Sequence, residues 1–321
     1  MNGNRNLMLK IGILASEGSW YYRDLERAAT SRGHICERLE FPRLIARVKS
    51  FSAEIRQATC QVSSANPASA PLHESESGKF EQKLSDFDFV LVRTMPPGSL
   101  EQVVYRMDVL ARLEVAGTRV INSPKSLECA VDKFLTTARL QAAGLPVPDT
   151  IVCEHEDDAL AAFEQLGHDV VVKPLFGSEG RGIVRVTDPD LAHRTFRTLM
   201  RLNAVLYLQR FVDHGGCDTR ILVLDGQIVG GMRRRSQDDF RTNVARAAVP
   251  EPHEPTNGEI ELALKATSTT GAYIAGVDLL YDRDGTCYVI EVNAVPGWQA
   301  FSRVTGNDVA TTLIDRLQRQ F

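Results

Sequence analysis

Three side chains with oxygen donors stand out in an apolar stretch near the end of the sequence: Asp278, Glu291 and Asn293. Asp284 and Gly285 between them predict a two-residue hairpin turn. Counting outward from that turn places Asp278 opposite Glu291, and the alternation of side chains puts Asn293 on the same face. Oxygen donors of this kind suit Mg²⁺ or Mn²⁺. The pattern predicts a metal site, and the alternative is an ordinary solvated hairpin face.

The opposite face of this hairpin is predicted to belong to the core. It carries Val277, Leu279, Tyr281, Tyr288, Ile290 and Val292. A four-residue loop would keep this assignment of faces, whereas a three-residue loop would break it.

A glycine loop suggests phosphate binding. Gly177, Gly180 and Gly182 follow an apolar strand that contains Lys173. Glycines let backbone N–H groups approach phosphates closely, and a lysine in an apolar strand needs an anionic partner. The loop lacks the Gly-Lys-Ser/Thr of a Walker A motif, and no helix follows it directly, which excludes a Rossmann turn. A plain glycine-rich turn is the other interpretation.

Residues 232–246 form a basic segment with five arginines in fifteen residues. The planar arginine fork suits carboxylates and phosphates, and a solvated charged face is the plain alternative. RNA binding is disfavoured, because aromatic residues do not interleave with the arginines and the net charge is −4. The few histidines form no recognisable Ser/His/Asp or Cys/His constellation.

The composition is that of an ordinary globular protein. The chain has 321 residues, of which 43% are hydrophobic and 24% charged, enough for two or three compact units. A pI near 6.0 favours neither a nucleic-acid nor a membrane-surface partner. No apolar run reaches the ~20 residues of a membrane span. Six scattered cysteines without a Cys-x-x-Cys pair argue against zinc and a disulfide framework, and favour the cytoplasm.

Strand and helix patterns divide the chain into three predicted domains. Residues 1–120 read as a small parallel α/β domain, with a mobile insertion near residues 58–80. Residues 121–205 contain two strands around the glycine loop, and residues 206–321 contain the predicted metal hairpin. The predicted strands cover 10–15, 35–41, 88–93, 169–175, 183–186 and 205–212, and the predicted helices cover 21–32, 99–117, 132–143, 158–166, 259–270 and 308–320.

In this order, the segments resemble the ATP-grasp superfamily, and most closely its RimK-type α-L-glutamate ligases. The resemblance runs from about Arg93 to the C-terminus. The matching stretches are 131–134, 171–182, 208–212, 216–220, 239–243, 275–278 and 291–297. The resemblance implies a mixed α/β and α+β architecture. In it, a pre-ATP-grasp domain precedes an ATP-grasp fold with a lid subdomain and a metal-binding C-terminal subdomain.

The resemblance also implies roles for individual residues. The implied ATP-binding residues are Lys133, Lys173, Gly177, Ser178, Gly180, Gly182, Arg210, Phe211, Asp218 and Asn243. Those implied to hold two Mg²⁺ or Mn²⁺ ions are Asp278, Glu291 and Asn293. Arg220 and Arg241 would be catalytic, and Arg93 and Arg106 would contact the acceptor's carboxylate. The family usually has Glu where this chain has Arg210, which leaves nucleotide preference open unless the adenine is read by backbone groups.

The implied reaction joins L-glutamate to a carboxylate acceptor, a small cofactor or a protein tail, through an acyl phosphate made with ATP. The stretch from Arg93 to Arg106 resembles a subgroup linked to tetrahydromethanopterin-dependent C1 metabolism. The resemblance is compatible with a homo-oligomer. Three alternatives stay open: a D-alanine–D-alanine or lysine-biosynthesis type of ligase, a nucleotide-binding regulator without ligase activity, and an RNA-associated module that uses the arginine segment.

Overall fold

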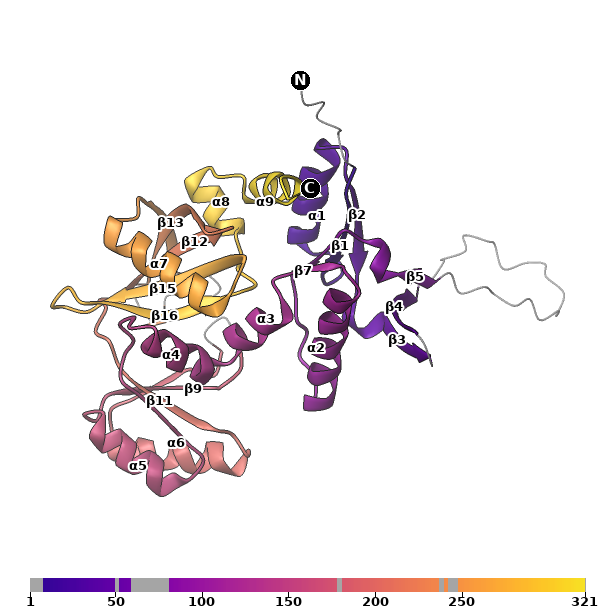
Figure 1. Cartoon of the computed structure of the whole chain (residues 1–321). Helices are drawn as coiled ribbons and strands as arrows, with labels where there is room; N and C mark the ends of the chain where they lie inside the picture. Colours follow the sequence, from indigo (N-terminus) through magenta and orange to yellow (C-terminus); the bar gives the residue numbers. More distant parts are fainter. Residues whose placement is uncertain are drawn as a thin grey trace, which may run out of the picture. The chain divides into compact units, whose positions relative to one another are not determined.

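The computed structural model of the chain describes residues 8–49, 52–58, 81–177, 181–236, 240–241 and 248–320. The chain divides into two compact units (Figure 1). Unit 1 comprises Met1–Pro124 and Ile314–Phe321, and unit 2 comprises Lys125–Leu313. Unit 1 therefore takes residues from two distant parts of the sequence.

Unit 1 contains the predicted parallel sheet. Its strands are β1 (Lys10–Leu14), β2 (Ile35–Leu39), β6 (Phe89–Val92) and β7 (Arg119–Ile121), in the order β2-β1-β6-β7. All three pairings are parallel. The residues of β6 are all buried, as expected for a parallel sheet whose two faces are covered. The predicted α/β domain is thus confirmed.

Two helices accompany this sheet, and each begins at a serine cap. Helix α1 (Trp20–Ser31) begins after Ser19, whose hydroxyl accepts the Tyr22 N–H. Helix α2 (Leu100–Val115), predicted over 99–117, begins with a capping box, in which Ser99 and Gln102 exchange side-chain and backbone hydrogen bonds.

A second, antiparallel sheet in unit 1 has no counterpart in the sequence prediction. It consists of β3 (Leu44–Lys49), β4 (Ser52–Ala58) and β5 (Glu81–Lys83), between the 3-10 turns η1 (Phe41–Arg43) and η2 (Leu84–Asp86). The predicted insertion near residues 58–80 lies, apart from its first residue, outside the described residues.

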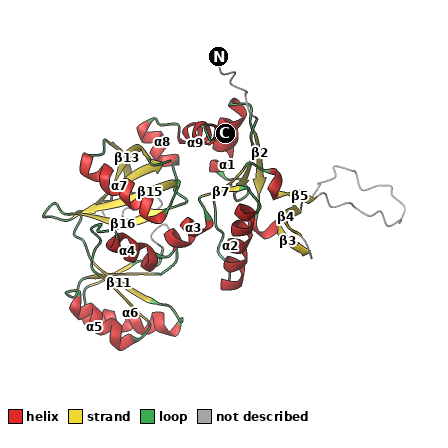
Figure 2. Ribbon diagram, in the orientation of Figure 1, coloured by secondary structure: helices red, strands yellow, loops and turns green. Residues whose placement is uncertain are grey.

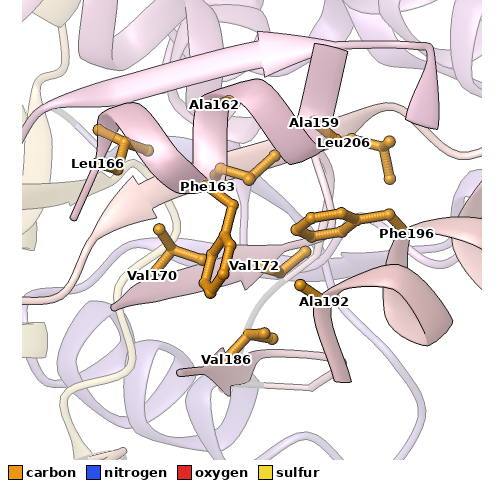
Figure 3. Close-up of a cluster of buried hydrophobic side chains, with 11 residues drawn as sticks. Ala159, Ala162, Phe163, Leu166, Val170, Val172, Val186, Ala192, Phe196 and Leu206 are labelled. Carbon is orange, nitrogen blue, oxygen red and sulfur yellow. The ribbon is translucent and has the colours of Figure 1, made fainter. Parts of the chain in front are cut away.

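The first sheet of unit 2 is antiparallel and carries two helices on one face (Figure 1). The strands β8 (Thr150–Cys153), β9 (Val170–Lys173), β10 (Val184–Val186) and β11 (Leu206–Arg210) lie in the order β10-β9-β11-β8. Figure 3 shows the core between this sheet and helices α5 (Glu156–Gln165) and α6 (Pro189–Arg201). Phe163 and Phe196 meet there edge to face, with ring centroids 6.4 Å apart. The predicted three-domain division stays a prediction.

The second sheet of unit 2 has five antiparallel strands (Figure 2). They are β12 (Cys217–Leu224), β13 (Gln227–Arg235), β14 (Val249–His253), β15 (Ile274–Tyr281) and β16 (Cys287–Asn293), in the order β14-β13-β12-β15-β16. Helix α7 (Asn257–Thr270) packs against β12, β15 and β16. Val277, Leu279 and Val292 are fully buried, and alternation leaves Asp218, Arg220 and Asp278 on the other face.

The remaining helices are α3 (Pro124–Val131), α4 (Lys133–Ala142), α8 (Gln299–Thr305) and α9 (Val309–Gln318). Across the described part of the chain, no helix combines the length and the apolar character that crossing a membrane requires. A cytoplasmic location stays a prediction.

Candidate active site

An open cleft lies in unit 2 and brings together residues from both of its sheets. Nine residues that the sequence singled out line this cleft: Lys133, Lys173, Gly177, Arg210, Phe211, Asp218, Arg241, Asp278 and Glu291. Segments up to 158 residues apart in the sequence thus supply one concave surface with several charged groups. Such a cleft is the usual form of a ligand site.

The other predicted residues lie elsewhere or are not described. Arg220 contacts the cleft residue Asp278, and Gly182 lies beside Pro174, which lines the cleft. The side chain of Asn293 accepts the Val295 N–H, 2.9 Å away. Arg93 and Arg106 belong to unit 1. Ser178, Gly180 and Asn243 lie outside the described residues.

Strand register explains how the charged cleft residues meet. Arg234 on β13 lies opposite Asp218 on β12. Arg220, two residues along β12, lies opposite Asp278 on β15, which in turn lies opposite Glu291 on β16. Opposed residues in an antiparallel sheet have neighbouring side chains. Four strands therefore bring two arginines and three carboxylates together in two neighbouring cross-strand rows.

Asp278 is held by two arginines. Arg220 donates from Nε and Nη2 to the two carboxylate oxygens at 2.6 and 2.7 Å, and Arg234 Nη2 approaches Oδ2 at 2.9 Å. Arg234 also donates from Nε to Asp218 Oδ1 at 2.7 Å and from Nη2 to Asp218 Oδ2. Arg234 is 2% exposed, so this is a buried network in which each charge has a partner.

Electrostatics keep Asp278 ionised. Burial alone would raise the pKa of its carboxyl group, but the charges and hydrogen bonds of Arg220 and Arg234 lower the pKa to about 2. Burial would lower the pKa of Arg234, but Asp278 and Asp218 raise it above its usual value. Both groups are therefore charged at every pH near neutrality.

The predicted pairing of Asp278 with Glu291 is confirmed, but the predicted turn is wrong. The Asp282 N–H donates to Thr286 O, which leaves three residues in the loop. Tyr281 pairs with Cys287 and Leu279 with Val289, and the register then shifts so that Asp278 meets Glu291. Ile290 is the extra residue of this β-bulge. The bulge offsets the longer loop.

The bulge also changes which side chains are buried. Val289 is 1% exposed and belongs to the core, whereas Ile290 lines the cleft beside Glu291. Tyr288 is half-buried, and its hydroxyl accepts a hydrogen bond from Arg210 Nη2 at 3.3 Å. The prediction that Ile290 and Tyr288 belong to the core is therefore wrong.

Two lysines line the cleft. Lys173 Nζ donates to Gln209 Oε1 at 2.6 Å, and Lys133 Nζ donates to Gly177 O at 2.7 Å. Burial lowers the pKa of Lys173 to about 8, although the Glu291 carboxylate raises it. Burial also lowers the pKa of Lys133, again against the attraction of Glu291. A bound anion would counteract this lowering and favour the charged form of both lysines.

A hydrogen-bond network fixes the environment of Lys173. Gln209 Nε2 donates to Thr150 Oγ1 at 2.9 Å and to the Tyr207 hydroxyl at 3.2 Å, so its oxygen faces the lysine. The Tyr207 hydroxyl also contacts Thr137 Oγ1 at 2.9 Å. Gln209 and Tyr207 were not singled out from the sequence, where they read as ordinary residues of a strand.

Arg210 and Phe211 meet the cleft at the end of β11. Their backbone N–H groups donate to Asp149 O and Asp169 O at 2.8 and 2.9 Å. The Arg210 side chain reaches Asp149 Oδ2 at 3.2 Å. The Phe211 ring lies 3.5 Å from the guanidinium carbon of Arg185. These contacts hold the strand end in place.

The described part of the glycine loop needs its glycines. Gly177 and Gly182 have φ of 128° and 72°, which side chains rarely adopt. A Cβ at Gly182 would also lie 3.5 Å from the Pro174 ring. At both ends of the loop, a residue with a side chain would therefore strain the backbone.

Arg234 lies in the basic segment 232–246, but the sequence did not single it out. Strand β13 includes the start of this segment, because it continues to Arg235. Counting outward from the turn at Asp225 and Gly226 would place Arg233 opposite Asp218. A register shift between Leu222 and Val223 places Arg234 there instead. Strand alternation could have suggested a buried arginine, but not which one.

The donor set fits a divalent cation that also binds phosphate. No group of three or more His, Cys, Asp or Glu side chains that could hold a metal occurs among the described residues. Asp278 and Glu291 offer carboxylate oxygens, and Asn293 offers an amide oxygen. Mg²⁺ in phosphate-binding sites takes one or two carboxylates and completes its shell with phosphate oxygens and water. The residues present match that need.

Two family models match the chain. The RimK-like ATP-grasp domain matches residues 130–317, and the N-terminal domain of prokaryotic glutathione synthetase matches residues 23–128. The chain is 31% identical to a tetrahydromethanopterin:α-L-glutamate ligase of Methanosarcina acetivorans, over 85% of this chain and 82% of the relative. It is 30% identical to a ribosomal protein bS6–L-glutamate ligase of Escherichia coli, over 97% and 96%.

The fold also matches solved structures. The ATP-grasp ligase PsnB, complexed with its minimal precursor, Mg and ADP, superposes with a TM-score of 0.71 at 21% identity. The match covers 97% of this chain and 96% of that one. The predicted ATP-grasp architecture is thereby confirmed.

Proposed function

The chain belongs to the RimK-like ATP-grasp family, and we propose that this ligase joins L-glutamate to a carboxylate acceptor through an amide bond. Proteins of this family bind ATP and Mg²⁺. The observation that carries the proposal is the cleft of unit 2, where two lysines line the same surface as Glu291 and the ionised Asp278. A cleft of this kind can bind a triphosphate and the cations that accompany it.

The cleft supports one orientation of the nucleotide. Leu280 and Ile290 offer an apolar surface for adenine. The N–H groups of Arg210 and Phe211 are already used, so we assign the next backbone donor, Val212, and the neighbouring carbonyls to the adenine edge. Backbone recognition explains how the chain tolerates arginine at position 210, whose side chain reaches Asp149.

Phosphate and ribose contacts follow from that orientation. Asp218 accepts two hydrogen bonds from Arg234 and lines the cleft, where we assign it to the ribose hydroxyls. Lys133, Lys173 and the loop from Gly177 to Gly182 would contact the phosphates. Asp278, Glu291 and Asn293 would hold Mg²⁺, two ions in this proposal, which would neutralise charge on the transferring phosphoryl group.

The reaction would have two steps. The acceptor carboxylate attacks the γ-phosphorus of ATP, so that ADP leaves and an acyl phosphate forms. The glutamate amine then attacks the activated carbonyl, and phosphate leaves from the tetrahedral intermediate. Lys133, Lys173 and Arg241 would stabilise the developing negative charge, and Arg220 has N–H groups left beside Asp278 for a substrate carboxylate.

The proposed acceptor is a small cofactor of the tetrahydromethanopterin type. The residues from Arg93 to Arg106 resemble the subgroup linked to that chemistry, and one relative is named for this acceptor. The C-terminal tail of protein bS6, for which another relative is named, is the comparison acceptor.

Mass spectrometry of the acceptor tests the proposal. The purified protein is incubated with ATP, Mg²⁺, L-glutamate and either acceptor, and ADP is measured in parallel. We expect one acceptor to gain the mass of a glutamyl residue with matching ADP. A Lys173→Met variant should lose both signals, and Arg235→Gln, outside the cleft, should keep them. ADP formation that never depends on glutamate or an acceptor would overturn the proposal.

A further inference from the structure

A chain of hydrogen bonds joins the elements that carry the two lysines of the cleft, and a tyrosine hydroxyl lies at its centre. Lys173 ends β9, whereas Lys133 begins α4, so the lysines belong to different elements. Two cationic groups can bind one chain of phosphates together only if the distance between them is kept. Contacts that fix one lysine relative to the other are therefore part of the site.

We propose that the hydroxyl of Tyr207 is a positioning group that couples Lys173 to Lys133. It keeps the amide oxygen of Gln209 turned toward Lys173. Through Thr137 it also joins the helix that begins with Lys133 to β11. The assignment of both lysines to a phosphate chain rests on the proposed function, whereas the coupling rests on the hydrogen bonds described below.

The strands bring the first half of this chain of hydrogen bonds together. Tyr207 on β11 lies opposite Lys173 on β9, and its ring centroid is 6.0 Å from the lysine Nζ. Gln209, two residues further along β11, lies on the same face and opposite Thr150 on β8. Tyr207 is 1% exposed and Gln209 3% exposed, so water competes little for their hydrogen bonds.

The hydroxyl groups give these hydrogen bonds a direction. Thr150 Oγ1 donates its single hydrogen to Pro148 O at 2.8 Å, so it can only accept from Gln209 Nε2, 2.9 Å away. The amide nitrogen therefore faces Thr150, and the amide oxygen faces Lys173 Nζ at 2.6 Å. The second N–H of Gln209 goes to the Tyr207 hydroxyl at 3.2 Å. The hydrogen of the Tyr207 hydroxyl is then left for a third partner.

That partner lies on α4. Thr137 Oγ1 is 2.9 Å from the Tyr207 hydroxyl, and Thr137 follows Lys133 by one helical turn, on the same face of the helix. Lys133 contacts the chain just after β9, because its backbone N–H donates to Leu175 O at 3.3 Å and its Nζ to Gly177 O at 2.7 Å. The start of α4 is thus held both to β11 and to the chain after β9.

Loss of the Tyr207 hydroxyl would loosen both ends of the network at once. An N–H of Gln209 would lose its acceptor, and α4 would lose its hydrogen bond to β11. The two ammonium groups would then keep their spacing less well, and a phosphate chain would bind more weakly. If the hydroxyls only satisfied each other in a buried place, their removal would lower the stability and leave phosphate binding unchanged.

Tyr207→Phe removes only the hydroxyl and tests the coupling. Calorimetry measures the affinity of the full chain for ADP with Mg²⁺, and thermal unfolding is followed in parallel. We expect the affinity to fall by about fivefold to tenfold, the usual net effect of one or two hydrogen bonds. Tyr281→Phe is the matched control, because Tyr281 is half-buried in the same unit and lies outside the cleft, and it should bind ADP as the wild type does.

The other end of the link supplies a rescue. Thr137→Val removes the second hydroxyl and should also weaken ADP binding, whereas Thr137→Ser keeps a hydroxyl and should restore it. The variant with both Tyr207→Phe and Thr137→Val should bind ADP about as well as Tyr207→Phe alone, because the same link is broken. Additive losses of affinity in the double variant would overturn the proposal.

Lysine backgrounds separate the coupling from a general effect on the cleft. Tyr207→Phe is repeated in the Lys173→Met and in the Lys133→Met protein. The loss of ADP affinity should shrink to about threefold or less in each, because one of the two groups on which the hydroxyl acts is already absent. An equal loss in all three backgrounds would contradict the coupling. A lower unfolding temperature of Tyr207→Phe with unchanged ADP affinity would contradict it as well.

This experiment and the test of the proposed function fail separately. Coupled losses of ADP affinity without any glutamate ligation would leave the role of Tyr207 standing and remove the proposed function. Glutamate ligation by the wild type, together with unchanged ADP affinity in Tyr207→Phe, would do the opposite.

Discussion

Two arginines contact the carboxylate of Asp278, and they limit how many of its oxygen positions a metal ion could use. An ionised carboxylate offers about four lone-pair positions, of which Arg220 and Arg234 use three. The remaining position is on Oδ1. Asp278 can therefore give a cation one oxygen while both arginines stay in place.

Arg234→Met tests the importance of this network. The variant leaves Asp218 without its arginine and Asp278 with Arg220 alone. We expect the free energy of unfolding, from urea denaturation, to fall by about 3–5 kcal/mol, the usual cost of breaking a buried ion pair. Arg235→Gln is the control, because Arg235 is half exposed and lies 3.8 Å from Glu251. Similar losses in both variants would contradict a special role for Arg234.

Lys173 predicts a pH dependence of nucleotide binding. Burial lowers its pKa to about 8, and a triphosphate binds the protonated form. Affinity should therefore be full below that value and fall as the pH rises through it, by up to about tenfold per pH unit. Calorimetry with ADP across this range measures the slope. In Lys173→Met the dependence of ADP affinity on pH should disappear. An affinity of the wild-type protein that does not change with pH would contradict phosphate binding by Lys173.

Arg241 tests the proposed chemistry. Its guanidinium carbon lies 5.7 Å from the Phe240 ring centroid, and Nη1 lies 3.5 Å from Ile183 O. If it stabilises charge in the transition state, Arg241→Ala should lower kcat by about 10²–10³ with little change in ADP affinity. Arg233→Ala, exposed on β13, is the control. Unchanged turnover in Arg241→Ala would remove Arg241 from the mechanism.

In the hairpin of β15 and β16, a longer loop and a β-bulge shift the strand register in opposite directions and cancel. The loop has one residue more than the Asp-Gly pattern predicts, and the bulge at Ile290 adds one residue to the other strand. Asp278 and Glu291 therefore meet as predicted, although the side chains between the loop and the bulge change faces. Val289, and not Ile290, joins the core.

A pair of alanine variants separates these two positions. Val289→Ala should lower the free energy of unfolding by about 1–3 kcal/mol, because it opens a cavity in the core. Ile290→Ala should cost less than about 1 kcal/mol and should instead weaken ADP binding, since its side chain lines the cleft. Thermal unfolding and ADP titration of both variants measure the difference. The opposite ranking would support the core assignment that alternation predicted for Ile290.

Elements were more predictable from the sequence than registers. Asp278, Glu291 and Lys173 can be recognised from the sequence, because a charged side chain in an apolar strand is costly to bury without a partner. The capping box at Ser99 and Gln102 is recognisable because it depends only on residues close in the sequence. Both bulges escaped prediction, because a bulge is set by packing on neighbouring strands and Ile290 is a normal strand residue. For the same reason, the sequence could not tell which arginine of the basic segment lies opposite Asp218.

At the scale of the whole molecule, unit 1 depends on residues after position 313. Arg32 pairs with Asp315 through two contacts of 2.7 and 3.1 Å, and Arg119 Nη1 donates to Gln320 Oε1 at 2.7 Å. Ile314 and Leu317 are fully buried. The sequence pattern predicted a final helix but not the unit to which it belongs.

A chain that ends at Leu313 tests this dependence. We expect unit 1 to lose about 3–6 kcal/mol, the value of burying Ile314 and Leu317, and to exchange its amide hydrogens faster. ADP binding to unit 2 should remain. A chain that ends at Gln318 loses the Gln320 contact but keeps the buried side chains, and should behave as the full chain. Unchanged exchange in unit 1 after truncation at Leu313 would contradict the division.

The split composition of unit 1 gives the protein an unusual order of assembly on the ribosome. Domains usually fold in the order in which they are made. Here the β2-β1-β6-β7 sheet emerges first, and roughly 190 residues of unit 2 must be made before residues 314–320 arrive, which takes roughly 10–40 s at usual rates of synthesis. Unit 2 is continuous and can complete its fold during that interval. Unit 1 stays incomplete during that interval, so its sheet is the part that chaperones would protect first.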